Sequence, residues 1–311
     1  MKAGVVPVFC NYNNRRMGLS RMWNSNEEVK FFQSMLKLYD ASKLFYLTEE
    51  GSFYAYWPKN YKGKKTTLQS RNSFIGAYTE KWLADMLKKA LKGEKLFVVH
   101  NAICEEIGLD KKTPADIVIS KRNGIRQKPE DILLIIEVKM SIVWNYEYNP
   151  IKGEVIKIGD FTTHTGNPSL LRSDSMLKAI GKSVNIRIYE KSSHIPIIVI
   201  GNTPISKSYY KKVDMLKKSG IIQAFISVNP NPCDACELNV KHTKGYGFIR
   251  IDNIGEFKDY ISRVISMRKE FTSFMIEKEK LGRYIEIAAK EKTFIEKADK
   301  LLNLLRGEGD G

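Results

Sequence analysis

The charged side chains at the end of one very apolar segment are the residues of this sequence best suited to chemistry. Residues 131–140 read Asp-Ile-Leu-Leu-Ile-Ile-Glu-Val-Lys-Met. This run predicts a strand buried on both faces, and strand alternation places Glu137 and Lys139 on the same face. Burying their charges costs several kcal/mol unless a partner or a metal compensates. We therefore expect a bound cation and a substrate phosphate here, which indicates an enzyme.

A second carboxylate begins the apolar segment that precedes this one. Residues 116–120 read Asp-Ile-Val-Ile-Ser, which predicts a short strand starting at Asp116. The Asn123-Gly124 pair favours a turn between the two strands. Because neighbouring antiparallel strands lie about 4.8 Å apart, we expect Asp116 and Glu137 to converge if the register permits it.

A third carboxylate, Glu80, lies on a predicted helix over residues 73–91. Apolar side chains recur there with the helical period, and Glu80 projects between Leu87 and Leu91 at the flank of the apolar arc. It is therefore aimed toward the edge of the core. Two or three carboxylates that meet at a sheet edge suit a hard divalent cation such as Mg²⁺, which can activate a water for attack on a phosphate.

The same residues resemble the signature of the PD-(D/E)XK nuclease superfamily. That signature has an acidic residue on one strand, which Thr113-Pro-Ala-Asp116 resembles, and an acid-x-lysine motif on the next, which Glu137-Val-Lys139 resembles. The preceding helix often adds a glutamate, and Gly76-Ala-Tyr-Thr-Glu80 is similar to this part. The resemblance covers roughly residues 72–230. It implies phosphodiester hydrolysis by metal-activated water that leaves a 5′-phosphate. It also implies that Asp116, Glu137 and Glu80 bind Mg²⁺ and that Lys139 positions the water or the phosphate.

The order of predicted elements indicates an α/β fold with a mixed central β-sheet flanked by helices. The helix at 73–91 precedes three strands, after which helices and strands alternate as far as residue 228. We expect an N-terminal accessory region (1–71), a core of the restriction-endonuclease type (72–232) and a C-terminal helical region (233–311). Both additions to the core are expected to be mainly helical.

Within the superfamily, length and architecture look most like a type II restriction endonuclease. Such enzymes add target-reading segments to the core, and residues 141–168, which are aromatic and polar without a clear period, suit this role. The candidate DNA-contacting residues combine stacking rings with phosphate-binding groups: Arg71, Trp144, Tyr146, Lys152, Lys157, His164, Arg172 and Lys178. Lys182 could also follow the DNA backbone. Since palindromic targets pair with two-fold proteins, we expect a homodimer on double-stranded DNA.

Charge and hydropathy agree with a nucleic-acid-binding protein. The 311 residues carry a formal net charge of +16 and have a mean hydropathy of −0.32, which favours polyanionic partners. No apolar run approaches the ~18 residues of a membrane span, and the N-terminus does not read as a signal peptide, so a cytoplasmic location is expected. No phosphate-binding loop or dinucleotide fingerprint occurs, so no nucleotide cofactor is expected.

Cysteine spacing suggests neither disulfides nor a complete zinc site. Cys233-Asp-Ala-Cys236 stands alone, and with His242 it offers three metal ligands at most. A reduced loop without metal is the preferred interpretation.

Plainer interpretations of the site residues remain open. Glu137 and Lys139 could form a salt-bridged strand end, and Glu80 could be an ordinary solvated side chain. Asp116 could be a turn residue after Pro114. The aromatic segment could simply cover the sheet, and the basic residues could serve solubility. Two rival functions follow: a repair or structure-specific nuclease of the same superfamily, or a non-catalytic nucleic-acid-binding protein.

Overall fold

A six-stranded mixed β-sheet forms the centre of the molecule in the computed structural model, which describes residues 22–234, 239–266 and 278–306. The strand order is β10-β9-β8-β5-β4-β3. The strands are β3 (Phe97–Ala102), β4 (Ala115–Ser120), β5 (Ile132–Val138), β8 (Ile197–Gly201), β9 (Ala224–Ser227) and β10 (Phe248–Arg250). β3, β4 and β5 pair antiparallel, whereas β5, β8, β9 and β10 run parallel. The predicted α/β class with a mixed, helix-flanked sheet is confirmed.

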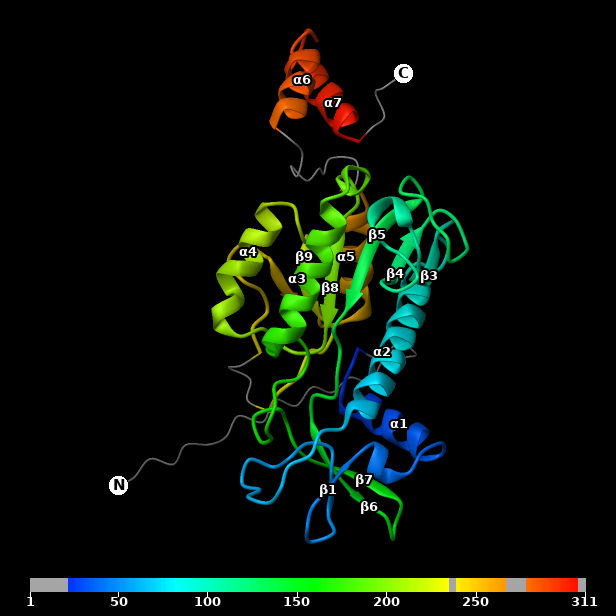
Figure 1. The fold of residues 1–311 in the computed structure, drawn as a ribbon, viewed down its shortest axis with the longest axis vertical. Helices are drawn as coiled ribbons and strands as arrows, with labels where there is room; N and C mark the ends of the chain where they lie inside the picture. The colour runs from blue at the N-terminus through cyan, green and yellow to red at the C-terminus, as the bar shows by residue number, and fades with distance from the viewer. Residues whose placement is uncertain (1–21, 235–238, 267–277, 307–311) are drawn as a thin grey trace, which may run out of the picture.

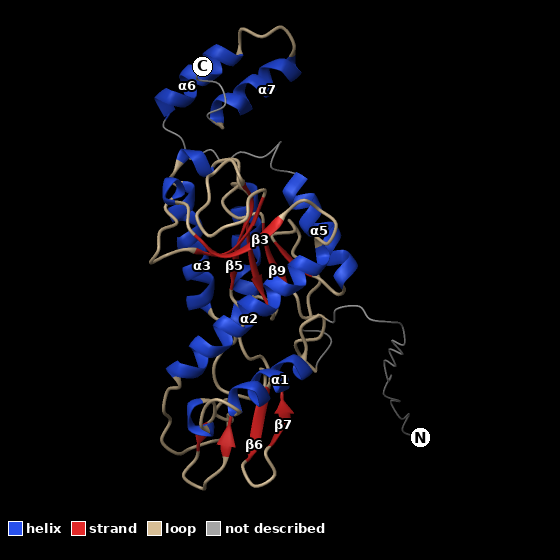
Figure 2. Ribbon diagram, turned by 90° about the vertical axis from the view of Figure 1, so that its right-hand side faces the viewer, coloured by secondary structure: helices blue, strands red, loops and turns tan. Residues whose placement is uncertain are grey.

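Helices cover both faces of this sheet. The helices are α2 (Gln69–Ala90) and α5 (Ile254–Ser266) on one face, and α3 (Ser173–Arg187) and α4 (Tyr210–Lys218) on the other (Figures 1 and 2). Strand alternation supplies apolar side chains to both layers. In β5, Leu134 and Ile136 pack in the cluster that includes α2 and α5, while Ile135 packs in the cluster that includes Ile186 of α3. All of β5 is buried, as its apolar run predicts.

A polar network holds the ends of β5 and β8 against the segment that leads into α3. Ser169 Oγ donates to the Lys139 carbonyl at 2.5 Å and accepts from the Asn202 N–H at 3.0 Å. The Asn202 side-chain amide donates to the Ser141 carbonyl at 2.7 Å. A Cβ at Gly201 would lie 2.6 Å from Ser169 Oγ, so this close approach requires glycine. The network thereby fixes the chain on either side of the candidate site.

A second unit, which we call the accessory lobe, consists of residues 22–68 and 141–167 and lies below the central sheet in Figure 1. Its antiparallel sheet has the order β1-β2-β6-β7. The elements are α1 (Ser25–Leu36), β1 (Tyr46–Leu47), β2 (Phe53–Tyr54), β6 (Asn145–Asn149) and β7 (Glu154–Gly159). The Asn24 side chain accepts from the N–H groups of Asn26 and Glu27 and caps α1.

The accessory lobe joins segments that the sequence analysis assigned to different regions. Phe53 of β2, in the predicted N-terminal region, pairs with Tyr148 of β6, in the predicted core region. Residues 141–168 also form a β-hairpin where the sequence shows no clear period. Two-residue strands such as β1 and β2 give too short a pattern to reveal this pairing, and β6 completes the sheet only through contacts distant in sequence.

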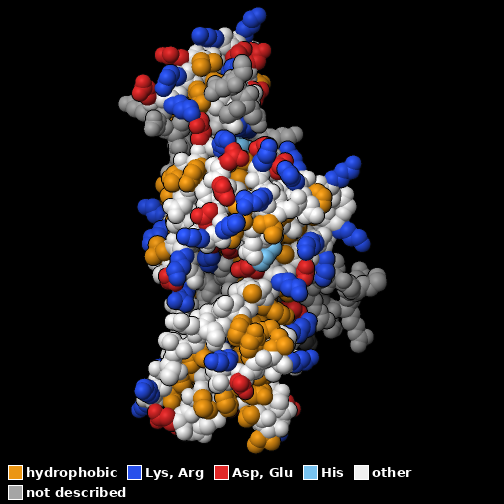
Figure 3. Space-filling model, turned by 45° about the vertical axis from the view of Figure 1, so that its right-hand side comes forward, with side chains coloured by type: hydrophobic (Ala, Val, Ile, Leu, Met, Phe, Trp, Pro, Cys, Tyr) orange, Lys and Arg blue, Asp and Glu red, His pale blue; other side chains and the backbone are white. Residues whose placement is uncertain are grey.

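The C-terminal region contains the predicted helices, but it also supplies β10 to the central sheet, so the core extends beyond the predicted boundary at residue 232. After α5 come α6 (Lys278–Ala288) and α7 (Phe294–Leu305), which pack on each other through Tyr284, Leu304 and Leu305 (Figure 1). This pair contacts the core: Lys280 forms an ion pair with Glu190 at 2.5 Å. In the part of the chain that the structure describes, no helix is both long and apolar enough to cross a membrane. Figure 3 shows Lys and Arg side chains spread among acidic ones over the core and these helices.

Candidate active site

The two strand carboxylates of the predicted motif meet at one rim of the central sheet. Ile117 of β4 pairs with Ile136 of β5, so Asp116 and Glu137 occupy the next positions of that antiparallel register. The backbone N–H of Val138 donates to Asp116 Oδ2 at 2.7 Å, which fixes the aspartate carboxylate against the neighbouring strand. Strand alternation directs both acids to the face that α3 covers.

Two lysines complete a group of four charges, which we call the charge cluster: Asp116, Glu137, Lys139 and Lys182. Lys139 Nζ donates to Glu137 Oε1 and lies 3.9 Å from Asp116 Oδ2. Lys182 Nζ lies 2.9 Å from Asp116 Oδ1 and 2.6 Å from Glu137 Oε2. Both carboxylates therefore share each ammonium, and the formal charge of the cluster is zero.

Burial and the oppositely charged neighbours act in opposite directions on the pKa values of Glu137 and Lys182. Desolvation raises the pKa of Glu137, the Asp116 carboxylate raises it further, and the Lys139 and Lys182 ammoniums lower it. Burial lowers the pKa of Lys182, but the Glu137 and Asp116 carboxylates outweigh this and raise it overall. Glu137 is 6% exposed, so its interaction with the lysines is only weakly screened by solvent.

Lys182 is the member of the cluster that sequence reasoning did not place there. The sequence analysis named it only as a residue that could follow a DNA backbone. Its position on α3, the helix that crosses from β5 to β8, brings it to the sheet face that carries Asp116 and Glu137. The helical spacing of Lys178 and Lys182 shows that they share one face of the helix. Only the packing of α3 reveals that this face reaches the carboxylates.

Glu80 lies elsewhere, contrary to the expectation that it points toward the other two acids. Its Oε2 lies 2.7 Å from Nε2 of His100 on β3. The reason is the layer order of the fold: α2 packs in the cluster with Ile117 and Ile136, on the sheet face opposite to Asp116 and Glu137. The flank of the apolar arc that Glu80 occupies therefore faces the edge strand β3.

The donor set of the cluster suits Mg²⁺ bound mainly by water and substrate. No group of three or more His, Cys, Asp and Glu side chains that could hold a metal occurs among the described residues. Mg²⁺, however, commonly uses one or two carboxylates together with waters and phosphate oxygens. One ammonium already touches Asp116 Oδ1 and Glu137 Oε2 at once, so a single cation at this point reaches both acids.

Three of the predicted DNA-contacting residues are buried in the accessory lobe. Trp144, Tyr146 and His164 are 3%, 0% and 2% exposed. The Tyr146 ring packs against Phe32 of α1, and the His164 ring stacks on Tyr56 with ring centroids 3.9 Å apart. The interpretation of these rings as DNA contacts fails because their faces are already occupied by the lobe itself.

Four other predicted contacts lie on the surface. Lys152 is exposed after β6, and Lys157 of β7 forms an ion pair with Asp234 at 3.1 Å. Arg172 and Lys178 lie 3.5 and 3.1 Å from the carboxylate of Asp174. These side chains remain available to a ligand, although three of the four already have an acidic partner.

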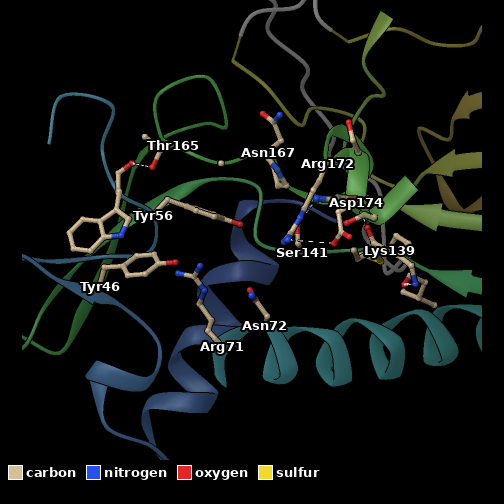
Figure 4. A pocket seen from close by; sticks show the side chains of 18 residues that line it. Tyr46, Tyr56, Arg71, Asn72, Lys139, Ser141, Thr165, Asn167, Arg172 and Asp174 are labelled. Atoms are coloured by element: carbon tan, nitrogen blue, oxygen red, sulfur yellow. Dashed lines mark hydrogen bonds and ion pairs between the residues drawn. The ribbon is translucent and has the colours of Figure 1, made fainter. Parts of the chain in front are cut away.

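The eighth, Arg71, lines a cavity between the accessory lobe and the core (Figure 4). The cavity has a volume of about 630 Å³ and is also lined by Lys139 of the charge cluster. Further polar lining comes from Asn72, Ser141, Asn167, Ser169 and the first turn of α3. The candidate active site therefore continues into an open cavity that residues of both the accessory lobe and the core line.

In the Cys233-x-x-Cys236 pair, Cys233 is buried, and Cys236 lies outside the described residues. The third potential ligand, His242, is engaged locally. Its ring stacks on Tyr246 with centroids 4.3 Å apart, and its Nδ1 lies 3.0 Å from the Thr243 carbonyl oxygen. The preference for a reduced loop stays a prediction.

Comparison of the chain with protein-family models, curated proteins and solved structures finds no match. The resemblance to the PD-(D/E)XK superfamily accordingly depends on the motif residues, and the functional argument depends on the geometry of the charge cluster.

Proposed function

We propose that this protein is a Mg²⁺-dependent endonuclease that hydrolyses double-stranded DNA in the manner of a type II restriction endonuclease. One observation carries the proposal: Asp116, Glu137 and Lys139 come from two neighbouring strands and meet at one sheet rim. The element order around them, α2, the meander β3-β4-β5, α3 and β8, agrees with a core of the restriction-endonuclease type. The net charge of +16 favours a polyanionic substrate.

The roles of the residues follow from their chemistry. Asp116 Oδ1 and Glu137 Oε2 would hold Mg²⁺, which when bound supplies activation of water and stabilisation of negative charge. Lys139, next to both acids, orients the attacking water or the phosphate through its ammonium. Attack of the water oxygen on phosphorus breaks the bond to the 3′ oxygen, which takes a proton. The products are a 5′-phosphate and a 3′-hydroxyl end.

The test is plasmid cleavage by the wild-type protein and by Asp116→Ala and Lys139→Ala. We expect cleavage to require Mg²⁺ and to disappear in both variants, while binding of DNA in a gel-shift assay persists. Asp85→Ala and Lys88→Ala are matched controls, because these two residues form an exposed pair on α2 at 3.7 Å. Cleavage that survives in both site variants would place the active site elsewhere.

Mapping of ends distinguishes a restriction enzyme from a repair or structure-specific nuclease. Digestion of a sequenced phage genome should give discrete fragments whose ends share one short, symmetric sequence. Symmetric ends would also agree with the proposed homodimer, because a two-fold target matches a two-fold protein. Nicking confined to branched or damaged DNA would favour the repair nuclease instead.

The neutral charge cluster specifically favours one further alternative, a non-catalytic nucleic-acid-binding protein. Two acids fully compensated by two lysines can serve as a structural ion-pair network. Failure of the protein to hydrolyse any DNA or RNA with Mg²⁺ or Mn²⁺, together with intact binding, would favour this alternative.

A further inference from the structure

The cavity beside Lys139 contains a buried positive charge without an acidic partner. Arg71 is 2% exposed, and it forms no ion pair with any carboxylate in the described parts of the chain. Its Nη1 donates to the carbonyl oxygens of Ala55 and Leu44. Carbonyl dipoles compensate a buried guanidinium only partly, so an arrangement of this kind favours binding of an anion.

Two tyrosines hold the Arg71 guanidinium in place. Its central carbon lies 5.1 Å from the centroid of the Tyr46 ring and 4.8 Å from that of Tyr56. The Tyr56 ring stacks on His164 with an interplanar angle of 5°, and Tyr46 stacks on Trp57. The rings therefore hold the cation by cation–π contacts, and they are not free to stack on a base. Figure 4 shows the guanidinium between the two tyrosines at the cavity wall.

The N-terminus of α3 faces the same cavity. Ser173, Asp174 and Ser175 of its first turn line the space, and the N-cap residue, Arg172, makes no side-chain capping hydrogen bond. The first N–H groups of a helix and its dipole attract negative charge. The Asp174 carboxylate, also in the lining, is neutralised by Arg172 and Lys178. The N-terminus of α3 and the guanidinium of Arg71 on α2 thus both present positive charge to the same cavity.

We infer that this cavity binds a phosphate of the nucleic-acid backbone other than the one cleaved. Arg71 donates to the phosphate from the first turn of α2, where Tyr46 and Tyr56 of the accessory lobe hold it, and the first turn of α3 donates as well. The inference depends on the proposed function, because it takes the substrate to be a polynucleotide. A planar, clamped guanidinium suits the bidentate contact that phosphate oxygens allow. The subsite would set the position of the strand relative to Lys139.

The experiment measures binding of duplex DNA, with Ca²⁺ in place of Mg²⁺, as a function of salt. The wild type is compared with Arg71→Gln and Arg71→Lys. Arg126→Gln serves as a matched control, because Arg126 is an exposed arginine paired with Glu105 at 3.4 Å. We expect Arg71→Gln to weaken binding about tenfold or more and to reduce the slope of log K against log salt by about 1. Arg71→Lys should bind between wild type and Arg71→Gln, and Arg126→Gln should match the wild type.

A second measurement does not depend on the folding of a variant at a buried position. Single phosphates of a duplex that spans a mapped cut site are replaced one at a time by neutral methylphosphonates, and wild-type binding is measured. We expect a large loss at the cleaved phosphate and at one further phosphate on the protein-contacted strand.

Three results would overturn the inference. Unchanged affinity and salt slope in folded Arg71→Gln would exclude a phosphate contact, and so would a methylphosphonate scan in which only the cleaved position matters. Saturable binding of inorganic phosphate or a mononucleotide by wild type but not Arg71→Gln, with equal DNA binding by both, would show a free-anion site instead. Absence of all nucleic-acid binding would reject the proposed function itself, which makes the two failures distinguishable.

Discussion

The accessory lobe and the rim of the central sheet each bury a glutamate, but they provide different hydrogen-bond donors to its carboxyl oxygens. Glu28 of α1, which is 0% exposed, accepts from the Trp23 indole at 3.0 Å and from the N–H groups of Val143 and Trp144 at 2.8 and 3.2 Å. Glu137 instead contacts two ammonium groups. The first carboxylate has neutral, fixed donors, and the second has charged donors on long side chains.

This difference separates a structural carboxylate from a candidate catalytic one. Backbone N–H groups cannot leave Glu28 without unfolding, so their bonds fasten α1 to the chain that enters β6. Lysine side chains can rotate away from Glu137 and leave its oxygens to a metal ion. Burial raises the pKa of both glutamates, that of Glu28 to about 8, and the Asp116 carboxylate adds to the rise at Glu137. A buried acid therefore indicates a functional site only when its partners can be exchanged.

The largest effect is expected from substitution of the two glutamates themselves, which tests the comparison directly. Glu137→Gln should reduce cleavage about 1000-fold or more, because a metal ligand that supplies several kcal/mol is lost. Glu28→Gln should retain cleavage at temperatures where it is folded. Plasmid cleavage rates, with Asp85→Asn as a matched exposed control, check both. Equal losses in the two variants would remove the distinction.

Lys182 tests whether the partners of Glu137 can be exchanged, because its ammonium occupies the point at which a metal ion would reach both acids. Lys182→Met should increase the affinity of the site for a divalent ion, since a competing ammonium is removed. Calorimetric titration of the DNA-free protein with Mn²⁺ measures this affinity, with Lys88→Met as the control. Unchanged or weaker ion binding would show that Lys182 does not compete.

Glu28 provides a pH test with a defined sign. Burial raises the pKa of Glu28 in the folded state from the usual 4.5 to about 8. Between pH 4.5 and pH 8, therefore, the Glu28 carboxyl is protonated in the folded state and ionised in the unfolded state. The contribution of Glu28 to stability should therefore be largest below pH 4.5, decline by about 1.4 kcal/mol per pH unit between pH 4.5 and 8, and level off above pH 8. Glu28→Gln cannot ionise and should show a flatter dependence. Urea unfolding at several pH values measures this, and parallel curves for both proteins would contradict it.

The smallest effect is expected at Glu80. The Glu80 side chain is 25% exposed, and that of its partner His100 is 40% exposed. Both lie on the sheet face that α2 covers, opposite to the face of Asp116 and Glu137. Glu80→Gln should change cleavage by less than about fivefold, as for other partly exposed pairs. A loss comparable to that of Glu137→Gln would mean that Glu80 reaches the metal from the opposite face, and would restore the predicted third ligand.

The sequence predicts those parts of the site that depend on strand geometry. The unbroken apolar run of β5 makes its burial predictable, and a side-chain period of two places Glu137 and Lys139 on one face. The turn between β4 and β5 makes Asp116 a natural neighbour of Glu137. These properties are local to one hairpin, so they hold whatever covers the sheet.

Which helix covers which face is decided only by the tertiary structure. The helical period gives Glu80 and Lys182 a side of their own helix, but it does not assign that side to a face of the sheet. Packing of α2 on one face and α3 on the other therefore moves Glu80 to His100 and brings Lys182 to the acids. In the same way, β6 pairs with β2 across about 90 residues of sequence and buries Tyr146. Burial and layer order arise from contacts between distant segments, and no local pattern encodes those contacts.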